Sequence, residues 1–224
     1  MRAFVLAIFT LLIVSCTNTD KNQVKHVLPF IGQADVEYKT VNGKDVADTV
    51  YPKVPNFRYI NQDSSWTQRS DFKGKILVVD FIFTHCPNIC PIMTHNMKLV
   101  QMATIDLENQ VEFVSFSIDP TNDTPSRFRE YIKEMEINAP NWVFLTGDEK
   151  KTYDLAMNHL WVGVEKSKVK GENILHDNKV VLVDKEGYVR GMYAGTETND
   201  MNRLQDDMRK LLKYEYGVKN AMAD

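Results

Sequence analysis

The sequence predicts an α/β domain in which a mixed β-sheet carries helices on both of its faces. Five short runs rich in apolar and β-branched residues are typical of strands, and segments with helical spacing lie between them. Strand and helix alternate from residue 76 to about residue 155, which favours parallel pairing through right-handed crossovers. The expected strands are Ile76–Phe83, Val111–Ile118, Trp142–Leu145, Lys179–Asp184 and Tyr188–Tyr193.

Three segments have the apolar periodicity of helices that pack one face against a sheet. Asp123-Thr124-Pro125 marks one helix start, because a capping side chain precedes a proline suited to the first turn, and Thr198-Asn199-Asp200 predicts another cap. The turn Asp184–Gly187 indicates two adjacent antiparallel strands. The apolar stripes are Met93, Met97, Val100, Thr104 and Leu107; Phe128, Tyr131, Ile132 and Met135; and Met201, Leu204, Met208 and Leu211.

Two short candidate strands, Ala34–Tyr38 and Phe57–Ile60, precede these elements and are expected to extend one edge of the same sheet. No internal repeat or second core is evident, so residues 31–224 are assigned to one domain. With 43% hydrophobic residues, the chain is long enough to bury a core. Its 27 basic and 30 acidic residues give a net charge of −3, which excludes a nucleic-acid binder that relies on a basic surface.

The first fifteen residues are interpreted as a signal peptide. Arg2 supplies a minimal positive region, and the apolar stretch Ala3–Val14 is followed by Ser15-Cys16, which resembles a bacterial lipobox. We therefore expect Cys16 to be lipidated, residues 16–30 to include a flexible tether, and the protein to be anchored at the extracytoplasmic (periplasmic) face of a bacterial membrane. An ordinary signal peptide or an anchor helix with an incidental cysteine is the alternative.

The remaining two cysteines, Cys86 and Cys90, follow the buried run Ile76–Phe83 and open a helix. Unpaired N–H groups at a helix start favour the thiolate form, which can carry out redox chemistry or bind a soft metal. A dithiol at a strand-to-helix junction suggests a thioredoxin-like fold, but the spacer here has three residues rather than two. Cysteines four positions apart can lie on one helix face and converge on one ion. A local disulfide is the other interpretation.

Three stretches together resemble the Sco (SenC/PrrC-like) copper proteins. Val79–Pro91 contains the CPxxCP signature, Ser117–Pro125 resembles the DPxxDTP segment, and Ile174–His176 resembles the segment with that family's histidine ligand. They follow the family's order within about residues 54–213. The chain departs from the pattern at Asn88, where the family often has an acidic residue, and at Asp177, where a serine is common.

The resemblance implies a thioredoxin-like copper protein with Cys86, Cys90 and His176 as ligands of Cu(I) or Cu(II). It further implies delivery of copper to the dinuclear centre of cytochrome c oxidase, with a copper-accepting oxidase subunit as partner. Two thiolates and an imidazole also match the softness of Cu(I) independently. A metallochaperone is thus favoured over an enzyme.

Two alternatives use the same cysteine pair. Cys86 and Cys90 can form the redox-active centre of a thiol-disulfide oxidoreductase that acts on exported cysteine pairs and depends on a thiol reductant. An inert structural disulfide is the other. A peroxiredoxin-like peroxidase is disfavoured. Its usual threonine lies three residues before the cysteine, whereas Thr84 lies two residues before Cys86.

Other residues near the motif are given structural roles. His85 and His95 are expected to be structural or to support the ligands, and Met93 and Met97 belong to the core stripe. Asp119 and Asp123 suit turn formation and helix capping, although they can also mark a partner surface.

Overall fold

The computed structural model describes residues 26–166 and 174–221. The predicted signal peptide and the lipidation site at Cys16 lie outside the described residues, so both stay predictions. No helix within the two described ranges is long and apolar enough to cross a membrane.

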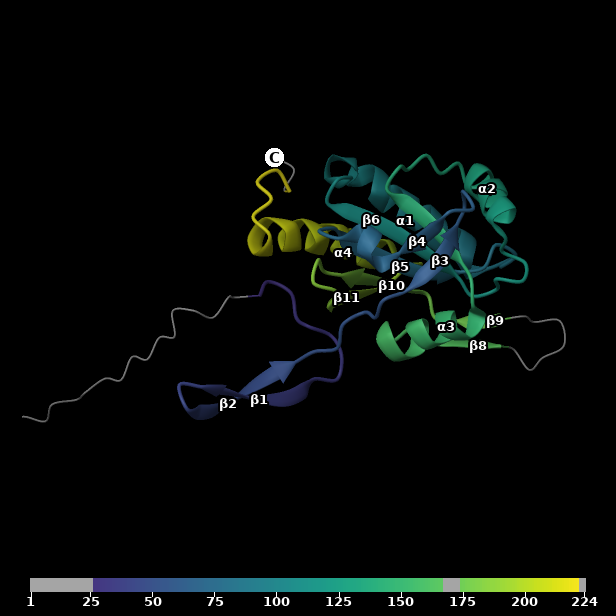
Figure 1. The fold of residues 1–224 in the computed structure, drawn as a ribbon. Helices are drawn as coiled ribbons and strands as arrows, with labels where there is room; N and C mark the ends of the chain where they lie inside the picture. Colours follow the sequence, from purple (N-terminus) through teal and green to yellow (C-terminus); the bar gives the residue numbers. More distant parts are fainter. Residues whose placement is uncertain (1–25, 167–173, 222–224) are drawn as a thin grey trace, which may run out of the picture.

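A seven-stranded mixed sheet forms the centre of the fold, with the strand order β11-β10-β5-β6-β7-β3-β4 (Figure 1). β5, β6 and β7 are parallel and β10 and β11 are antiparallel, as the sequence predicted, and the other neighbouring pairs are antiparallel as well. All seven residues of β5 and all seven of β6 are buried. This burial fits the central place of the two strands, because a central strand is covered on both faces. The strands are β3 (Arg58–Asn61), β4 (Trp66–Gln68), β5 (Ile76–Ile82), β6 (Val111–Ser117), β7 (Trp142–Thr146), β10 (Lys179–Val183) and β11 (Val189–Ala194).

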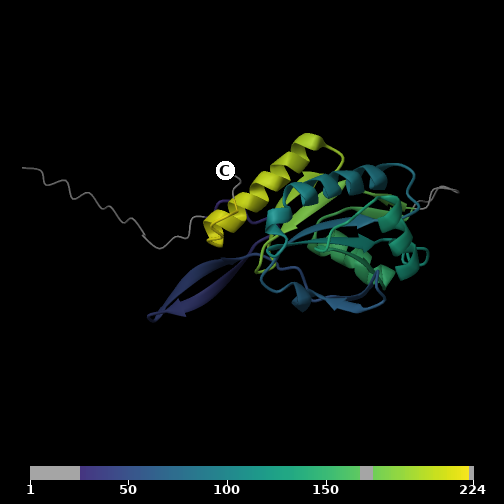
Figure 2. The same ribbon diagram turned by 90° about the horizontal axis from the view of Figure 1, so that it is seen from above.

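Helices cover both faces of this sheet, which confirms the predicted architecture (Figure 2). α1 and α4 lie side by side on one face, and α2 adjoins α1 through a 2.9 Å hydrogen bond between Thr94 and Tyr131. α3 lies on the opposite face, where Thr152 donates to the hydroxyl of Tyr59 at 3.2 Å. The helices are α1 (Ile89–Ala103), α2 (Pro125–Glu134), α3 (Glu149–Asp154) and α4 (Thr198–Lys210), with short 3-10 segments Arg69–Phe72 and Ile105–Leu107 and π segments Leu155–His159 and Leu211–Glu215.

The two predicted helix starts differ in outcome. Thr124 caps α2, since its hydroxyl accepts the backbone N–H of Arg127 at 3.2 Å. The predicted cap at Thr198 is wrong, because that residue is already the first of α4 and Glu197 before it makes no side-chain cap. Asp200 instead accepts the backbone N–H of Ala194, so its carboxylate joins α4 to the end of β11.

The first upstream strand does not extend the main sheet, which corrects the prediction for Ala34–Tyr38. Within residues 26–166 and 174–221, β1 (Asp35–Val41) pairs only with β2 (Lys44–Val50), and the two form a separate hairpin that projects from the body (Figure 1). All seven residues of β1 are exposed, so no apolar face attaches it to the core. The second upstream strand, β3, does join the sheet edge beside β7.

A buried arginine holds the two ends of the described chain against β11. Arg190 is 2% exposed, and its guanidinium donates to Asp184 at 3.0 Å and to Glu215 at 2.6 Å. It also donates to the backbone carbonyls of Leu28 and Pro29. A charged side chain inside an otherwise apolar strand therefore has a complete set of partners, as its burial requires.

Candidate metal centre

The two cysteines lie where β5 turns into α1. The backbone N–H of Cys86 donates to the carbonyl of Phe83 at 3.1 Å, which closes the turn, and Cys90 lies in the first turn of α1. Cys90 is fully buried, whereas Cys86 is 9% exposed and lies nearest to solvent. Both are free thiols.

His176 reaches the same place from the other side. It ends β9 (Ile174–His176), which pairs with β8 (Val164–Lys166) in a small hairpin outside the main sheet. Asp177 fixes the base of this hairpin, because its carboxylate accepts the backbone N–H of Gly163 at 3.0 Å and binds Lys179 at 2.7 Å. Asp177 thus helps to position its neighbour, His176.

The structure brings the three predicted ligands together. The Sγ atoms of Cys86 and Cys90 and a ring nitrogen of His176 all lie within 4.8 Å of one another. Nε2 of His176 lies 3.1 Å from Sγ of Cys90, and Nδ1 lies 2.9 Å from the carbonyl oxygen of Asp177. Because a carbonyl only accepts, Nδ1 carries the hydrogen, and the lone pair of Nε2 faces the sulfurs.

This geometry fits one soft metal ion. With bond lengths of about 2.3 Å to sulfur and about 2.0 Å to nitrogen, by analogy with zinc, ligands of one ion lie at most about 4.6 Å apart. The group therefore closes on an ion with shifts of a few tenths of an ångström. A backbone acceptor on the second ring nitrogen is the usual support for a metal-binding histidine.

The two thiols have opposite protonation tendencies. A hydrogen bond from the Cys90 thiol and backbone N–H groups at the start of α1 lower the pKa of Cys86, although burial opposes them. The pKa of Cys90 is raised, because its thiol donates to Cys86 and is deeply buried. The first proton therefore leaves the cysteine nearest to solvent, which suits either metal capture or attack on a disulfide.

Asp80 is a buried carboxylate beneath the centre that the sequence analysis did not single out. It is fully buried in β5, and neither carboxylate oxygen has a hydrogen-bond partner among residues 26–166 and 174–221. Burial raises the pKa of Asp80 to about 6. An acidic residue inside an apolar strand was the available sequence signal.

Asp123 anchors the turn that carries Cys86. It is fully buried and accepts the hydroxyls of Thr84 and Ser117, each at 2.6 Å, together with the backbone N–H of Thr84 at 3.1 Å. Burial raises the pKa of Asp123, and these hydrogen bonds oppose the rise. A partner-surface role is therefore wrong for Asp123, which instead fastens the DPxxDTP segment to the turn before the cysteine motif.

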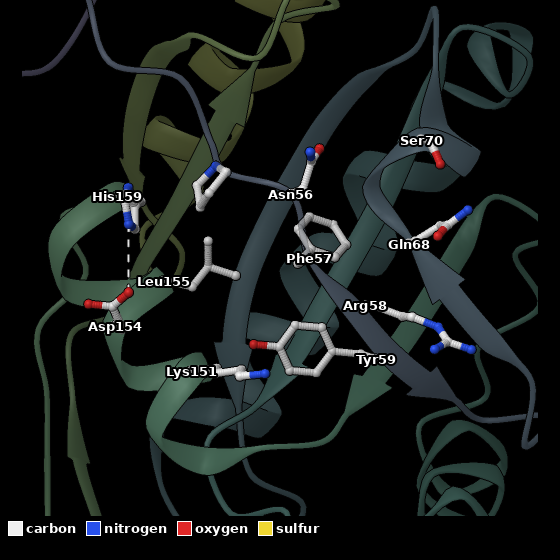
Figure 3. A pocket seen from close by; sticks show the side chains of 11 residues that line it. Asn56, Phe57, Arg58, Tyr59, Gln68, Ser70, Lys151, Asp154, Leu155 and His159 are labelled. Carbon is white, nitrogen blue, oxygen red and sulfur yellow. Dashed lines mark ion pairs between the residues drawn. The ribbon is translucent and has the colours of Figure 1, made fainter.

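The other candidates lie outside the centre. His85 and His95 are exposed and do not join the group, whereas Met93 and Met97 are fully buried in the core as predicted. A cavity of about 610 Å³ also lies away from the cysteines, between β3 and α3, where Phe57 and Tyr59 form part of its wall (Figure 3).

Comparison with known proteins identifies the family. The family model described as SCO1/SenC matches residues 47–213. The chain belongs to the SCO1/SenC family. It is 30% identical over 169 residues to the SCO1 protein homolog of Bacillus subtilis (strain 168), a match covering 75% of this chain and 86% of that relative.

Solved SCO1/SenC structures share the fold. A SCO1/SenC family lipoprotein from Bacillus anthracis str. Ames is 31% identical with a TM-score of 0.66, over 71% of this chain and 94% of that one. BsSco is 31% identical with a TM-score of 0.62, over 70% of this chain and 92% of that one. It is described with a disulfide switch and as a member of the Sco family of cytochrome c oxidase assembly proteins. Copper-bound ScoI of Bradyrhizobium japonicum shares the fold, with 21% identity and a TM-score of 0.59 over 71% of this chain and 99% of that one.

Removing the Asp123 carboxylate should destabilise the fold. Asp123→Ala leaves two buried hydroxyls and a backbone N–H without their acceptor, so we expect the free energy of unfolding to fall by about 3 kcal/mol or more. Asn122→Ala, one residue away on the exposed side of the same loop, is the matched control and should change it by less than about 1 kcal/mol. Urea denaturation measures both, and equal losses would contradict the anchoring role.

Asp80 should make stability depend on pH. Because its folded-state pKa of about 6 exceeds its ordinary value, the folded chain holds this proton more tightly than the unfolded chain. Its contribution to stability is therefore lost as pH rises from about 4 through about 6, by about 3 kcal/mol in total. We expect the stability of Asp80→Asn relative to the unmodified chain to rise across that window in urea titrations. A difference that stays constant with pH would refute this.

Proposed function

We propose that this protein is an extracytoplasmic, lipid-anchored copper chaperone that delivers copper to the dinuclear copper centre of cytochrome c oxidase. The observation that carries the proposal is the convergence of two thiol sulfurs and the unprotonated nitrogen of His176 within 4.8 Å. Two thiolates and an imidazole are the donor set expected for Cu(I), and the imidazole also suits Cu(II).

Copper is the cargo in this proposal, and the donor set suits both capture and release. Three ligands leave one side of an ion open, so that a ligand of the acceptor can bind before a ligand of this chain departs. Cys86 is the more exposed of the two cysteine ligands, which makes it the thiolate at which exchange begins. Buried Cys90 and the hydrogen-bonded ring of His176 then hold the ion while the exchange begins.

Location and partner rest on other observations. Ser15-Cys16 after an apolar stretch supports export and lipidation, and the similar Bacillus anthracis protein is described as a lipoprotein. The description of BsSco as a cytochrome c oxidase assembly protein supports an oxidase subunit as the acceptor. A thiol reductant is needed as well, because only the reduced pair binds copper.

A thiol-disulfide oxidoreductase is the second candidate, favoured by the opposite pKa shifts of the two thiols. The Cys86 thiolate would attack a substrate disulfide, form a mixed disulfide and release one substrate thiolate. Cys90, after losing its proton, would displace the second substrate thiolate and form the Cys86–Cys90 disulfide. The substrate is then reduced by two electrons, this chain is oxidised, and a thiol reductant restores it.

Copper titration of the purified full chain tests the primary proposal. We expect one tightly held Cu(I) per chain and at least a hundredfold weaker binding in Cys86→Ala, Cys90→Ala and His176→Ala, since each removes a ligand. His85→Ala is the matched control, because it removes an exposed imidazole next to Cys86 and should bind copper normally. Undiminished binding in the three ligand variants would refute the metal centre. Disulfide turnover that tolerates both His176→Ala and copper chelation would favour the oxidoreductase.

A further inference from the structure

The hairpin formed by β1 and β2 pairs with no other strand in the part of the chain that the structure describes. It projects from the body beside the N-terminal end of the described chain, far from β9 in both views (Figures 1 and 2). All of β1 and all but the last residue of β2 are exposed, including Tyr38 at 73% and Val36 at 59%. A two-stranded hairpin alone is marginally stable in water, so this element gains most from a further strand.

The turn defines which edge of β1 is free. Asn42 and Gly43 both have positive φ, at 51° and 76°, as a two-residue type I′ turn requires. The flanking residues Val41 and Lys44 are then a hydrogen-bonded pair, and bonded pairs alternate along the strands. The backbone groups of Val36, Tyr38 and Thr40 therefore point away from β2, towards any strand that is added.

The charges on β1 are incompletely satisfied within one hairpin. Glu37 lies directly across from Asp48, and like charges in that position destabilise an antiparallel pair. Lys39 already forms an ion pair with Asp48 from the diagonal position. Glu37 is thus the residue on β1 that gains most from a cation supplied by an additional strand.

We propose that β1 pairs antiparallel with β1 of a second copy of this chain, around a two-fold axis at Tyr38. In this register Tyr38 faces Tyr38 of the second copy, and Val36 faces Thr40, so the outward backbone groups meet. Glu37 then lies opposite Lys39 of the second copy, and this pair occurs twice. The four-stranded sheet that results replaces two marginal hairpins.

The other edge of the hairpin is less suited to self-pairing. A two-fold axis at Ala47 of β2 would place Val46 opposite Asp48 and Asp45 opposite Thr49, with no pair of opposite charges. Pairing through β1 leaves both metal centres accessible, because the hairpin and β9 lie at opposite ends of the molecule in Figure 1. The pairing is argued from the hairpin itself and does not rest on the proposed function.

Sedimentation equilibrium of the full chain in mild detergent tests this proposal. We expect a monomer–dimer equilibrium that Glu37→Lys weakens about tenfold or more, because two attractive pairs become repulsive. The same change places the new lysine opposite Asp48 and should strengthen each hairpin, so unfolding of the hairpin does not explain the loss. Combining Glu37→Lys with Lys39→Glu restores the opposite-charge pairs and should restore the dimer. A chain that is monomeric at every concentration, or an equilibrium that Glu37→Lys leaves unchanged, would overturn the proposal.

Disulfide trapping in membranes gives a second test. In a full chain that carries Cys86→Ser and Cys90→Ser, Tyr38→Cys should form a covalent dimer on mild oxidation, since a bonded antiparallel pair has Cα atoms about 5.5 Å apart. Ala47→Cys lies directly across the hairpin on β2 and is the matched control, which should stay uncrosslinked. Crosslinking through Ala47→Cys alone, or equally through both positions, would overturn the assignment of the interface to β1.

Discussion

The hydrogen bond between Nδ1 of His176 and the carbonyl of Asp177 is the interaction on which the rest of the site depends. It determines that Nε2 carries the lone pair, and the short β8–β9 hairpin points this nitrogen at the two sulfurs. Asp177 supports the arrangement twice, through its backbone oxygen and through its carboxylate at the base of the hairpin. Without it, the remaining donor set would be a dithiol.

The opposite wall of the site is held by buried polar groups. Asp123 connects the turn before Cys86 to the end of β6, and Asp80 lies beneath the centre without a hydrogen-bond partner among the described residues. An unpaired buried carboxylate costs stability, so its presence next to two thiols is consistent with a functional constraint rather than a packing requirement. The core around it, which includes Met93 and Met97, is apolar and tightly buried.

The sequence predicted the elements whose signals are local. The continuous apolar runs at β5 and β6 predicted central strands, and Thr124-Pro125 predicted the start of α2. It failed where the deciding contact is distant. Nothing in residues 34–38 reveals that they avoid the main sheet, and the complete set of partners around Arg190 comes from both ends of the described chain. His176 itself was found only through a family resemblance, because a lone histidine in a polar segment has no periodic signal.

X-ray absorption spectroscopy of the full chain loaded with one equivalent of Cu(I) tests the central claim most directly. The account predicts a copper shell of two sulfurs at about 2.2–2.3 Å and one nitrogen at about 2.0 Å, by analogy with zinc bond lengths. A shell of sulfur alone, or one without two sulfurs, would contradict the convergence of Cys86, Cys90 and His176 on a single ion.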